Sequence, residues 1–299
     1  MHVTRPARAL SDAQPKARTR EWRLVVPDTA AADSAGDGGA AAGSGDTRAI
    51  GTTTAADRSA PAADGATNMA IDQALLDAAA HDGAPRLRFY RWRPACLSLG
   101  RNQPARGCYD GPDVRPGRNV VRRPTGGLAV MHDREITYAV VASVDELGGP
   151  RACYRAVNRA LVESLRSLGV PAGLAGEDAV APRPDQPGGA CFAAPAPGEV
   201  VAGGRKLVGS AQRRQGRALL QHGSVLIGGR QQGAEDGVVT LEQLLPQPPS
   251  ESALVRALLG GFESVLGILL APAPLLESEK QAVRAHERRF RSATWTWRR

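Results

Sequence analysis

Residues 28–65 contain almost no large apolar side chain and are mostly Ala, Gly, Asp, Ser and Thr. Such a segment buries too little apolar surface to offset the entropy that it loses on ordering. We therefore expect a low-complexity, flexible insertion at 28–65 and a disordered basic tail at 1–20. The core has to come from the rest of the chain, so residues 21–299 are expected to form a single domain around the insertion.

Four segments have the apolar spacing of amphipathic helices. The first begins near Asn68, a residue type favoured at N-caps, and places Ile71, Leu75 and Leu76 on one face. The other helices are expected at 150–169, 254–266 and 277–290.

Short β-type runs lie between these helices. Segments 87–92 and 96–99 predict one hairpin. Segments 206–212 and 219–227 predict a second hairpin, with its turn around Gly216. Further strands are expected at 22–26, 119–123, 136–143 and 199–201.

The formal net charge is +8, and the excess lies from Thr67 onward because the charges before it balance. A basic folded part suggests an acidic partner, which is nucleic acid, an anionic membrane or an acidic protein. Aromatic residues that stack on bases make up only 4% of the chain, so an acidic carrier protein fits at least as well as nucleic acid. No apolar stretch is long enough for a membrane span or a signal region, so we expect a cytoplasmic protein with no membrane partner.

The four cysteines, Cys96, Cys108, Cys153 and Cys191, are widely spaced and form no CxxC pair. This spacing suggests neither a disulfide framework nor a zinc ribbon, so sulfur chemistry should come from one thiol. Cys191 lies in the small-residue loop GGACF, where a thiol stays accessible to a ligand. A free cysteine taken alone is more often a small buried apolar residue, so the context of Cys191 has to decide its role. Cys153, at the start of an expected helix, is a weak rival.

Two basic segments are candidates for binding an anion or an acyl carbonyl. Lys206 lies in GGRKLVGSAQRR, at the start of a strand. Such a lysine is usually solvated, but an ammonium beside an acyl carbonyl would stabilise its developing negative charge and a neighbouring thiolate. Residues 122–127, RRPTGG, combine two guanidinium groups with two glycines. This combination suits phosphate or carboxylate groups, although the chain has no Walker loop.

His132 and His222 are the histidines that lie next to strand segments. None of the five histidines has metal-ligand spacing to another, so we expect no metal site and structural hydrogen bonds for these two.

Taken together, these segments resemble the catalytic domain shared by lipoate-protein ligases, octanoyltransferases and biotin ligases. The resemblance runs from Trp22 onward apart from the insertion. It is carried, in order, by NMAID at 68–72, LRFYRW at 87–92, LSLG at 97–100, RRPTGG at 122–127, His132-Asp133, Thr137-Tyr138, residues 204–213 and QHGS at 221–224.

The resemblance implies an α/β (α+β) fold with a mixed central β-sheet flanked by helices, as in biotin and lipoate protein ligase catalytic domains. It makes Cys191 and Lys206 the catalytic residues. It also implies an acyl tunnel bordered by residues 122–127, His132 and Lys206. The substrate-binding residues that it implies are Arg122, Arg123, Thr125, Gly126, Gly127, His132, Gly209, Ser210, Ala211 and His222.

Within the family the chain looks most like the cysteine-dependent octanoyltransferases, because Cys191 precedes the glycine-lysine strand as their nucleophile does. This likeness implies transfer of octanoyl, or lipoyl, from acyl carrier protein to a lysine of a lipoyl-domain protein or of the glycine cleavage H protein. The acyl group would pass through a Cys191 thioester, with no cofactor and no nucleic acid.

Three alternatives stay open. The first is an amidotransferase that takes octanoyl from the H protein through the same Cys191. The second is an ATP-dependent lipoate ligase, in which ATP and Mg would be needed and Cys191 would be incidental. The third is a catalytically dead module that only binds carrier proteins. Gln73 also departs from the family pattern, since relatives often have an acidic residue there.

Overall fold

The computed structural model describes residues 20–28, 60–105, 107–109, 115–179, 191–231 and 234–299. The tail expected at 1–20 lies outside the described residues except for Arg20, and so does most of the insertion expected at 28–65.

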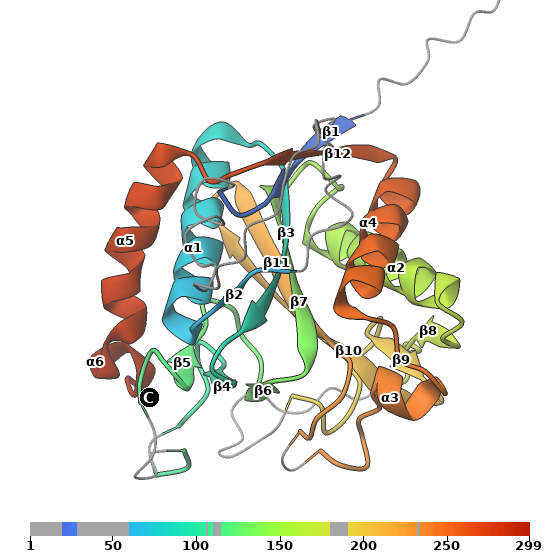
Figure 1. The fold of residues 1–299 in the computed structure, drawn as a ribbon. Coiled ribbons are helices and arrows are strands. Elements are labelled where there is room, and N and C mark those ends of the chain that lie inside the picture. Colours follow the sequence, from blue (N-terminus) through green and yellow to red (C-terminus); the bar gives the residue numbers. More distant parts are fainter. Residues whose placement is uncertain (1–19, 29–59, 106, 110–114, 180–190, 232–233) are drawn as a thin grey trace, which may run out of the picture.

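A large mixed sheet forms the centre of the molecule (Figure 1). Within the described residues its strands are β1 (Arg20–Val25), β2 (Ala62–Ala63), β3 (Arg86–Trp92), β7 (Glu135–Ser143), β8 (Ala172–Leu174), β9 (Val200–Ala202), β10 (Arg205–Gln215), β11 (Ala218–Leu226) and β12 (Ile268–Ala273). Their order is β12-β1-β3-β7-β11-β10-β9-β8, and β2 pairs with β3. β12, β1 and β3 run parallel, whereas each neighbouring pair from β3 to β8 is antiparallel.

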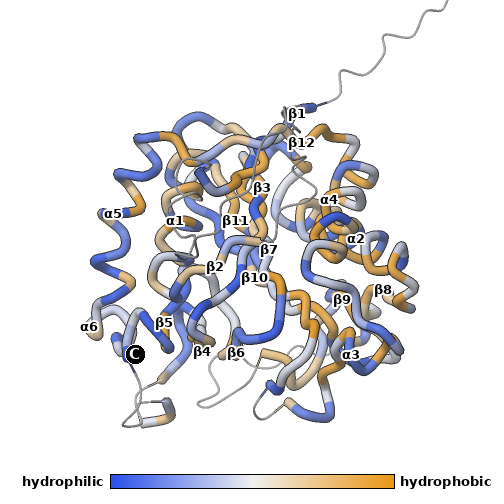
Figure 2. The backbone as a smooth tube through the Cα atoms, in the orientation of Figure 1, coloured by the Kyte–Doolittle hydropathy of each residue, from blue (hydrophilic) through white to orange (hydrophobic). Residues whose placement is uncertain are grey.

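Helices cover both faces of this sheet, so the domain has three layers (Figure 1). α1 (Gly65–Asp82) and α5 (Glu277–Arg291) pack together on one face, and α2 (Pro150–Ser167) and α4 (Glu251–Leu266) pack together on the other. Side chains of β3 point to both faces of the sheet. Leu87 and Phe89 belong to the core between the sheet and the helices α2 and α4, whereas Tyr90 and Trp92 belong to the core on the side of α1. The outer helix α5 is mostly hydrophilic, as its colouring in Figure 2 shows.

A small sheet of the order β5-β4-β6 closes one end of the domain. It consists of β4 (Cys96–Leu99), β5 (Val120–Arg122) and β6 (Val130–His132), and the short helices α3 (Leu241–Leu244) and α6 (Ala293–Thr296) complete the elements of the described residues. The buried guanidinium of Arg122 joins this end to α6, because its Nε donates to the carbonyl of Thr296 at 2.8 Å.

The expected fold class is confirmed, and so are the four helices and the hairpin of β10 and β11 with its turn at Gly216. The hairpin expected from 87–92 and 96–99 is wrong, because β3 belongs to the large sheet and β4 to the small one. Each strand finds its partners far along the chain, which short-range turn signals do not reveal.

The start of α1 also differs from expectation. Its N-cap is Asp64, whose carboxylate accepts from the Thr67 amide at 2.9 Å, and not Asn68. The Asn68 amide group instead donates to the carbonyls of Ala63 and Arg91. The end of the expected insertion therefore contains β2, the N-cap Asp64 and the first residue of α1.

Candidate active site

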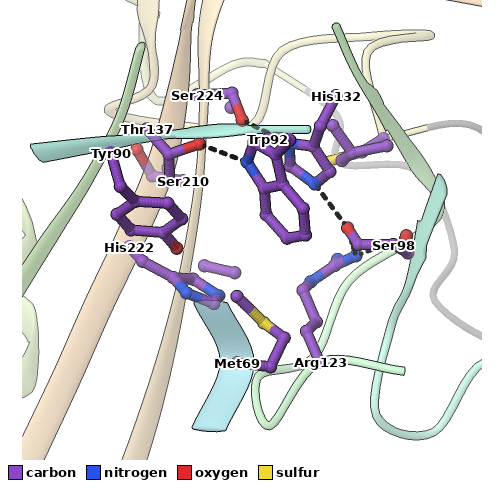
Figure 3. Close-up of a pocket in the computed structure, with 15 residues that line it drawn as sticks. Met69, Tyr90, Trp92, Ser98, Arg123, His132, Thr137, Ser210, His222 and Ser224 are labelled. Carbon is purple, nitrogen blue, oxygen red and sulfur yellow. Dashed lines mark hydrogen bonds between the residues drawn. The ribbon is translucent and has the colours of Figure 1, made fainter. Parts of the chain in front are cut away.

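A pocket opens beside the small sheet, between β10, β11 and the start of α1 (Figure 3). It encloses about 340 Å³ of space free of atoms, part of it open to solvent. Its wall consists of Met69, Tyr90, Trp92, Ser98, Arg123, Val130, His132, Thr137, Cys191, Gly209, Ser210, Ala211, His222, Gly223 and Ser224. A pocket with an apolar part and a few convergent polar groups is the usual form of a small-molecule site.

Cys191 and Lys206 meet at this pocket. The Nζ of Lys206 lies 3.6 Å from the Cys191 Sγ and donates to the Cys191 carbonyl at 2.9 Å. The amide of Cys191 donates to the Ala129 carbonyl at 2.9 Å, which fixes the loop beside β6. The thiol is half-buried, unlike those of Cys96 and Cys153, which are buried away from the pocket. Burial raises the pKa of Cys96 and brings that of Cys153 to about 12, so neither is a good nucleophile.

A buried carboxylate holds Lys206 in place. The Glu199 Oε2 lies 2.7 Å from the Lys206 Nζ, and both side chains are nearly inaccessible to solvent. Burial works to lower the pKa of Lys206, but the negative charges of a Cys191 thiolate and of Glu199 outweigh it and raise the pKa. Lys206 is therefore a fixed positive charge next to the thiol at neutral pH.

His132 is locked by hydrogen bonds at both ring nitrogens. Its Nδ1 lies 2.8 Å from the Glu135 carboxylate and its Nε2 lies 2.7 Å from the Ser98 hydroxyl. The ring stacks on Trp92 with the centroids 3.9 Å apart, and the Trp92 indole N–H donates to Thr137 at 2.8 Å (Figure 3). The stacked pair gives the pocket a rigid wall.

His222 is held in the same way on the other side of the pocket. Its Nδ1 lies 2.8 Å from the buried Asp72 carboxylate and its Nε2 lies 2.6 Å from the Thr125 hydroxyl. Asp72 also accepts from Arg88 and Tyr90. Burial lowers the pKa of His222, although Asp72 opposes this effect, so the ring is neutral at neutral pH.

Gly209, Ser210 and Ala211 of β10 also line the pocket, and Ala211 pairs with His222 of β11. A Cβ on Gly209 would approach the ring of Phe192 to 2.8 Å, so only glycine leaves room for the residue that follows Cys191. The Ser210 hydroxyl is turned to Tyr138, at 2.7 Å.

The two arginines of RRPTGG have different surroundings. Arg123 lines the pocket, and its guanidinium donates to the Ser98, Gly126 and Leu128 carbonyls. Arg122 does not line the pocket, because its guanidinium donates to carbonyls of the loop at 100–103 and to Thr296. Burial and neighbouring arginines lower the pKa of Arg122 to about 10.

The structure therefore brings most of the expected site residues together, but not all of them. Five do not line the pocket: Lys206 beside Cys191, Thr125 behind His222, and Arg122, Gly126 and Gly127. Sequence reasoning missed the supporting carboxylates Glu199 and Glu135 and the wall residue Trp92 as members of the site. Trp92 could have been found, because it lies in the family motif LRFYRW. Glu199 could not, because a glutamate before an apolar strand does not indicate that it pairs with a lysine.

Among the described residues no group of three or more His, Cys, Asp or Glu side chains could hold a metal ion. In the same part of the chain, no helix is both long enough and apolar enough to cross a membrane.

The comparisons with known proteins agree with this fold. Residues 64–263 match the lipoyl protein ligase A/B catalytic domain, and the chain belongs to this family. Its curated relatives include the octanoyltransferase LipM of Kyrpidia tusciae, 36% identical over 78% of this chain and 94% of the relative. The octanoyltransferase LipM of Symbiobacterium thermophilum is 37% identical with the same coverage.

Solved structures show the same architecture. Lipoate-protein ligase A bound with ATP superposes with a TM-score of 0.61 at 21% identity, covering 80% of this chain and 99% of the ligase. The bipartite lipoate protein ligase of Thermoplasma acidophilum, solved as part of a study that includes its E2 lipoyl domain, has a TM-score of 0.59 at 22% identity. The superposition covers 80% of this chain and 94% of the Thermoplasma acidophilum chain.

Proposed function

We propose that this chain transfers an octanoyl group to a lysine of a lipoyl-domain protein through a covalent thioester on Cys191. The observation that carries the proposal is the half-buried Cys191 thiol in the wall of the pocket, which lies 3.6 Å from the ammonium of Lys206. The chain is an acyltransferase of the lipoate-protein ligase family, since the octanoyltransferases it matches align over 94% of their length.

The first step is attack of the Cys191 thiolate on the carbonyl carbon of an octanoyl thioester. The donor thiol leaves with the electron pair of the broken C–S bond and takes up a proton, and octanoyl remains on the Cys191 Sγ. Lys206 favours the thiolate because its positive charge is fixed beside the sulfur by Glu199.

The second step is attack of a neutral acceptor lysine amine on the same carbonyl carbon. The C–S bond to Cys191 breaks, the thiolate is regenerated, and the amine loses a proton as the amide forms. An ammonium near the carbonyl stabilises the oxyanion in both steps. The octanoyl chain would lie in the pocket against Trp92 and Met69.

Neither step uses ATP or a metal ion, because the energy of the donor thioester drives amide formation. We propose acyl carrier protein as the donor and a lipoyl domain or the glycine cleavage H protein as the acceptor. The net charge of +8 supports acidic protein partners.

The experiment is intact-mass analysis of the chain after incubation with octanoyl acyl carrier protein and no ATP. We expect an octanoyl adduct that maps to Cys191 and then disappears when a lipoyl domain is added. Cys191→Ala should give no adduct, whereas Cys108→Ser, which changes an exposed thiol outside the pocket, should behave as wild type.

Two results would overturn the mechanism. One is full activity of Cys191→Ala with ATP and free octanoate, which indicates a ligase. The other is acylation of Cys191 by octanoylated H protein but not by the carrier thioester, which indicates an amidotransferase.

A further inference from the structure

Three half-buried arginines surround the indole of Trp295 in α6, and a fourth lies next to them. We call Arg101, Arg213, Arg289 and Arg298 the arginine cluster. The guanidinium carbons of Arg101, Arg289 and Arg298 lie 5.5, 4.3 and 4.2 Å from the centroid of the Trp295 ring. Arg213 reaches the same place from β10, and its charge is coupled to those of the other three.

Hydrogen bonding in this region is incomplete. Among the described residues, seven buried side-chain atoms have no hydrogen-bond partner. Five of the seven are here: Arg101 Nη1, Arg122 Nη2, Arg289 Nε, Thr296 Oγ1 and Arg298 Nε. Buried donors in native proteins nearly always have an acceptor, so this concentration points to a ligand that supplies acceptors.

The charges of the arginine cluster are also poorly compensated. Burial and the neighbouring Arg101 and Arg289 lower the pKa of Arg213 to about 10. Asp77 acts on Arg213 and Arg289, but its carboxylate is already taken by His286, Gln73 and Gln215.

Gln73 lies between Arg213 and Arg289 of the arginine cluster and does not neutralise them. Its Oε1 accepts from Arg213 at 3.1 Å and from Arg289 at 3.4 Å. A carboxylate at this position would neutralise one positive charge, whereas the glutamine amide carries none.

The arginine cluster adjoins the acyl pocket. The Arg101 amide donates to the Thr125 carbonyl at 2.7 Å, and the Thr125 hydroxyl bonds His222 in the pocket wall. On β10, Arg213 is two residues from the wall residue Ala211 and therefore on the same side of the strand.

Much of the arginine cluster also lies outside the shared family domain. Arg289, Trp295 and Arg298 come after residue 263, where the match to that domain ends. These three residues therefore lie beyond the part of the chain that matches the catalytic-domain model.

We propose that the arginine cluster binds the phosphodiester of the prosthetic arm on which an acyl carrier presents its octanoyl thioester. Guanidinium groups that approach from three different segments suit the several oxygens of a phosphoryl group, and an arginine fork binds two of them at once. The inference rests on the proposed function and deepens it, because it selects the donor. An octanoyl-lysine on the H protein carries no such phosphoryl group.

The first test compares octanoyl-phosphopantetheine with octanoyl-pantetheine as donors for the full chain. The two thioesters are identical except for the phosphate. We expect kcat/KM to favour the phosphorylated donor by about tenfold or more, which corresponds to about 1.4 kcal/mol. Arg101→Gln/Arg298→Gln should lose this preference and keep the rate with octanoyl-pantetheine. Arg288→Gln, an exposed arginine on α5 outside the cluster, should retain the preference.

The second test does not depend on catalysis. Phosphopantetheine without an acyl group should raise the Tm of the wild-type chain more than pantetheine does at matched ionic strength, and the double variant should lose this difference. Equal effects of the two compounds on wild type overturn the inference. So does a preference that survives in the double variant. Loss of acyl transfer with this Tm difference intact contradicts the proposed function but not the phosphoryl site. A last outcome also contradicts the proposal: inorganic phosphate raises the Tm as much as phosphopantetheine does, and kcat/KM shows no preference for the phosphorylated donor. The cluster would then be a site for free phosphate.

Discussion

At the scale of single residues, the site depends on a buried ion pair. Lys206 and Glu199 are both almost fully buried, and the sulfur of Cys191 lies beside them. A buried ion pair that loses one partner leaves an uncompensated charge, which costs far more than an exposed pair contributes. The position of Lys206, and through it the reactivity of Cys191, thus depends on Glu199.

Glu199→Gln tests this dependence. We expect acylation of Cys191 to slow by about tenfold to hundredfold because the ammonium is no longer held beside the sulfur. The free energy of unfolding should fall by about 3–5 kcal/mol, since Lys206 stays buried without its partner. Intact-mass time courses measure the first effect and urea unfolding the second. Glu199→Asp keeps the charge and should restore much of the acylation rate. Equal rates for both variants would show that the carboxylate charge is unimportant.

His222 makes stability depend on pH. Burial lowers its pKa in the folded chain, while the unfolded chain titrates near the ordinary value of about 6.5. As the pH falls below about 6.5, the unfolded state therefore binds a proton that the folded state does not, and stability is lost. The slope contributed by one such group approaches about 1.4 kcal/mol per pH unit.

Urea unfolding between about pH 7.5 and 5.5 measures this slope. His222→Gln should unfold with a smaller dependence on pH than wild type. His81→Gln, which changes an exposed histidine on α1, should keep the wild-type dependence. The assignment to His222 fails if the two variants have the same pH dependence.

At the scale of elements, local signals located the helices and one hairpin but gave a false hairpin where the strands pair over long distances. Apolar spacing located the helices, and the turn at Gly216 located the pairing of β10 with β11. Nothing local shows that β3 and β4 go to different sheets. β12 was missed because its residues, Ile268–Ala273, carry a proline and pair only with β1, from the other end of the chain.

The strand β10 positions the nucleophile loop through a close contact. Phe192 fills the space over Gly209, where a Cβ would lie 2.8 Å from the ring. Gly209→Ala should push the Phe192 ring and displace Cys191 with it. We expect slower acylation of Cys191 and a loss of about 1–3 kcal/mol in stability from overpacking.

Gly173→Ala on β8 is the matched control for this strand effect. It also introduces a methyl group on a strand, but nothing lies within 4 Å of its Cβ position and its φ is not positive. It should acylate at the wild-type rate. A normal rate for Gly209→Ala as well would show that the loop adapts to the added methyl group.

At the scale of the whole molecule, the family motifs predicted which segments meet, but not how the charges between them are arranged. Cys191, Lys206, His132 and His222 were expected to share one site, and three of them line the pocket while Lys206 touches Cys191. The arginine cluster could not be predicted, because Arg101, Arg213 and the pair Arg289 and Arg298 come from segments far apart in the sequence. Individually, such arginines look like solvated surface charges.

The pairing of β1 and β2 with β3 explains how the domain accommodates the insertion between them. β1 and β2 lie one after the other along the same edge of β3: Leu24 pairs with Leu87, and Ala62 pairs with Arg91. The Arg91 amide also donates to the Pro61 carbonyl at 2.8 Å. The chain therefore leaves the edge of β3 and returns to it a few residues further along, so the segment between is not needed to connect distant parts of the core.

Replacing residues 29–59 with a Gly-Ser linker of about six residues should then leave the fold and acyl transfer intact. Closing a loop several-fold shorter costs less entropy, so we expect a gain of about 1 kcal/mol in the free energy of unfolding. Urea unfolding and the rate of Cys191 acylation are the measurements, with wild type as the reference. A loss of transfer to the lipoyl domain, with acylation of Cys191 unchanged, would mean that this segment takes part in acceptor binding. A loss of stability would mean that its residues contribute to the core, which their composition argues against.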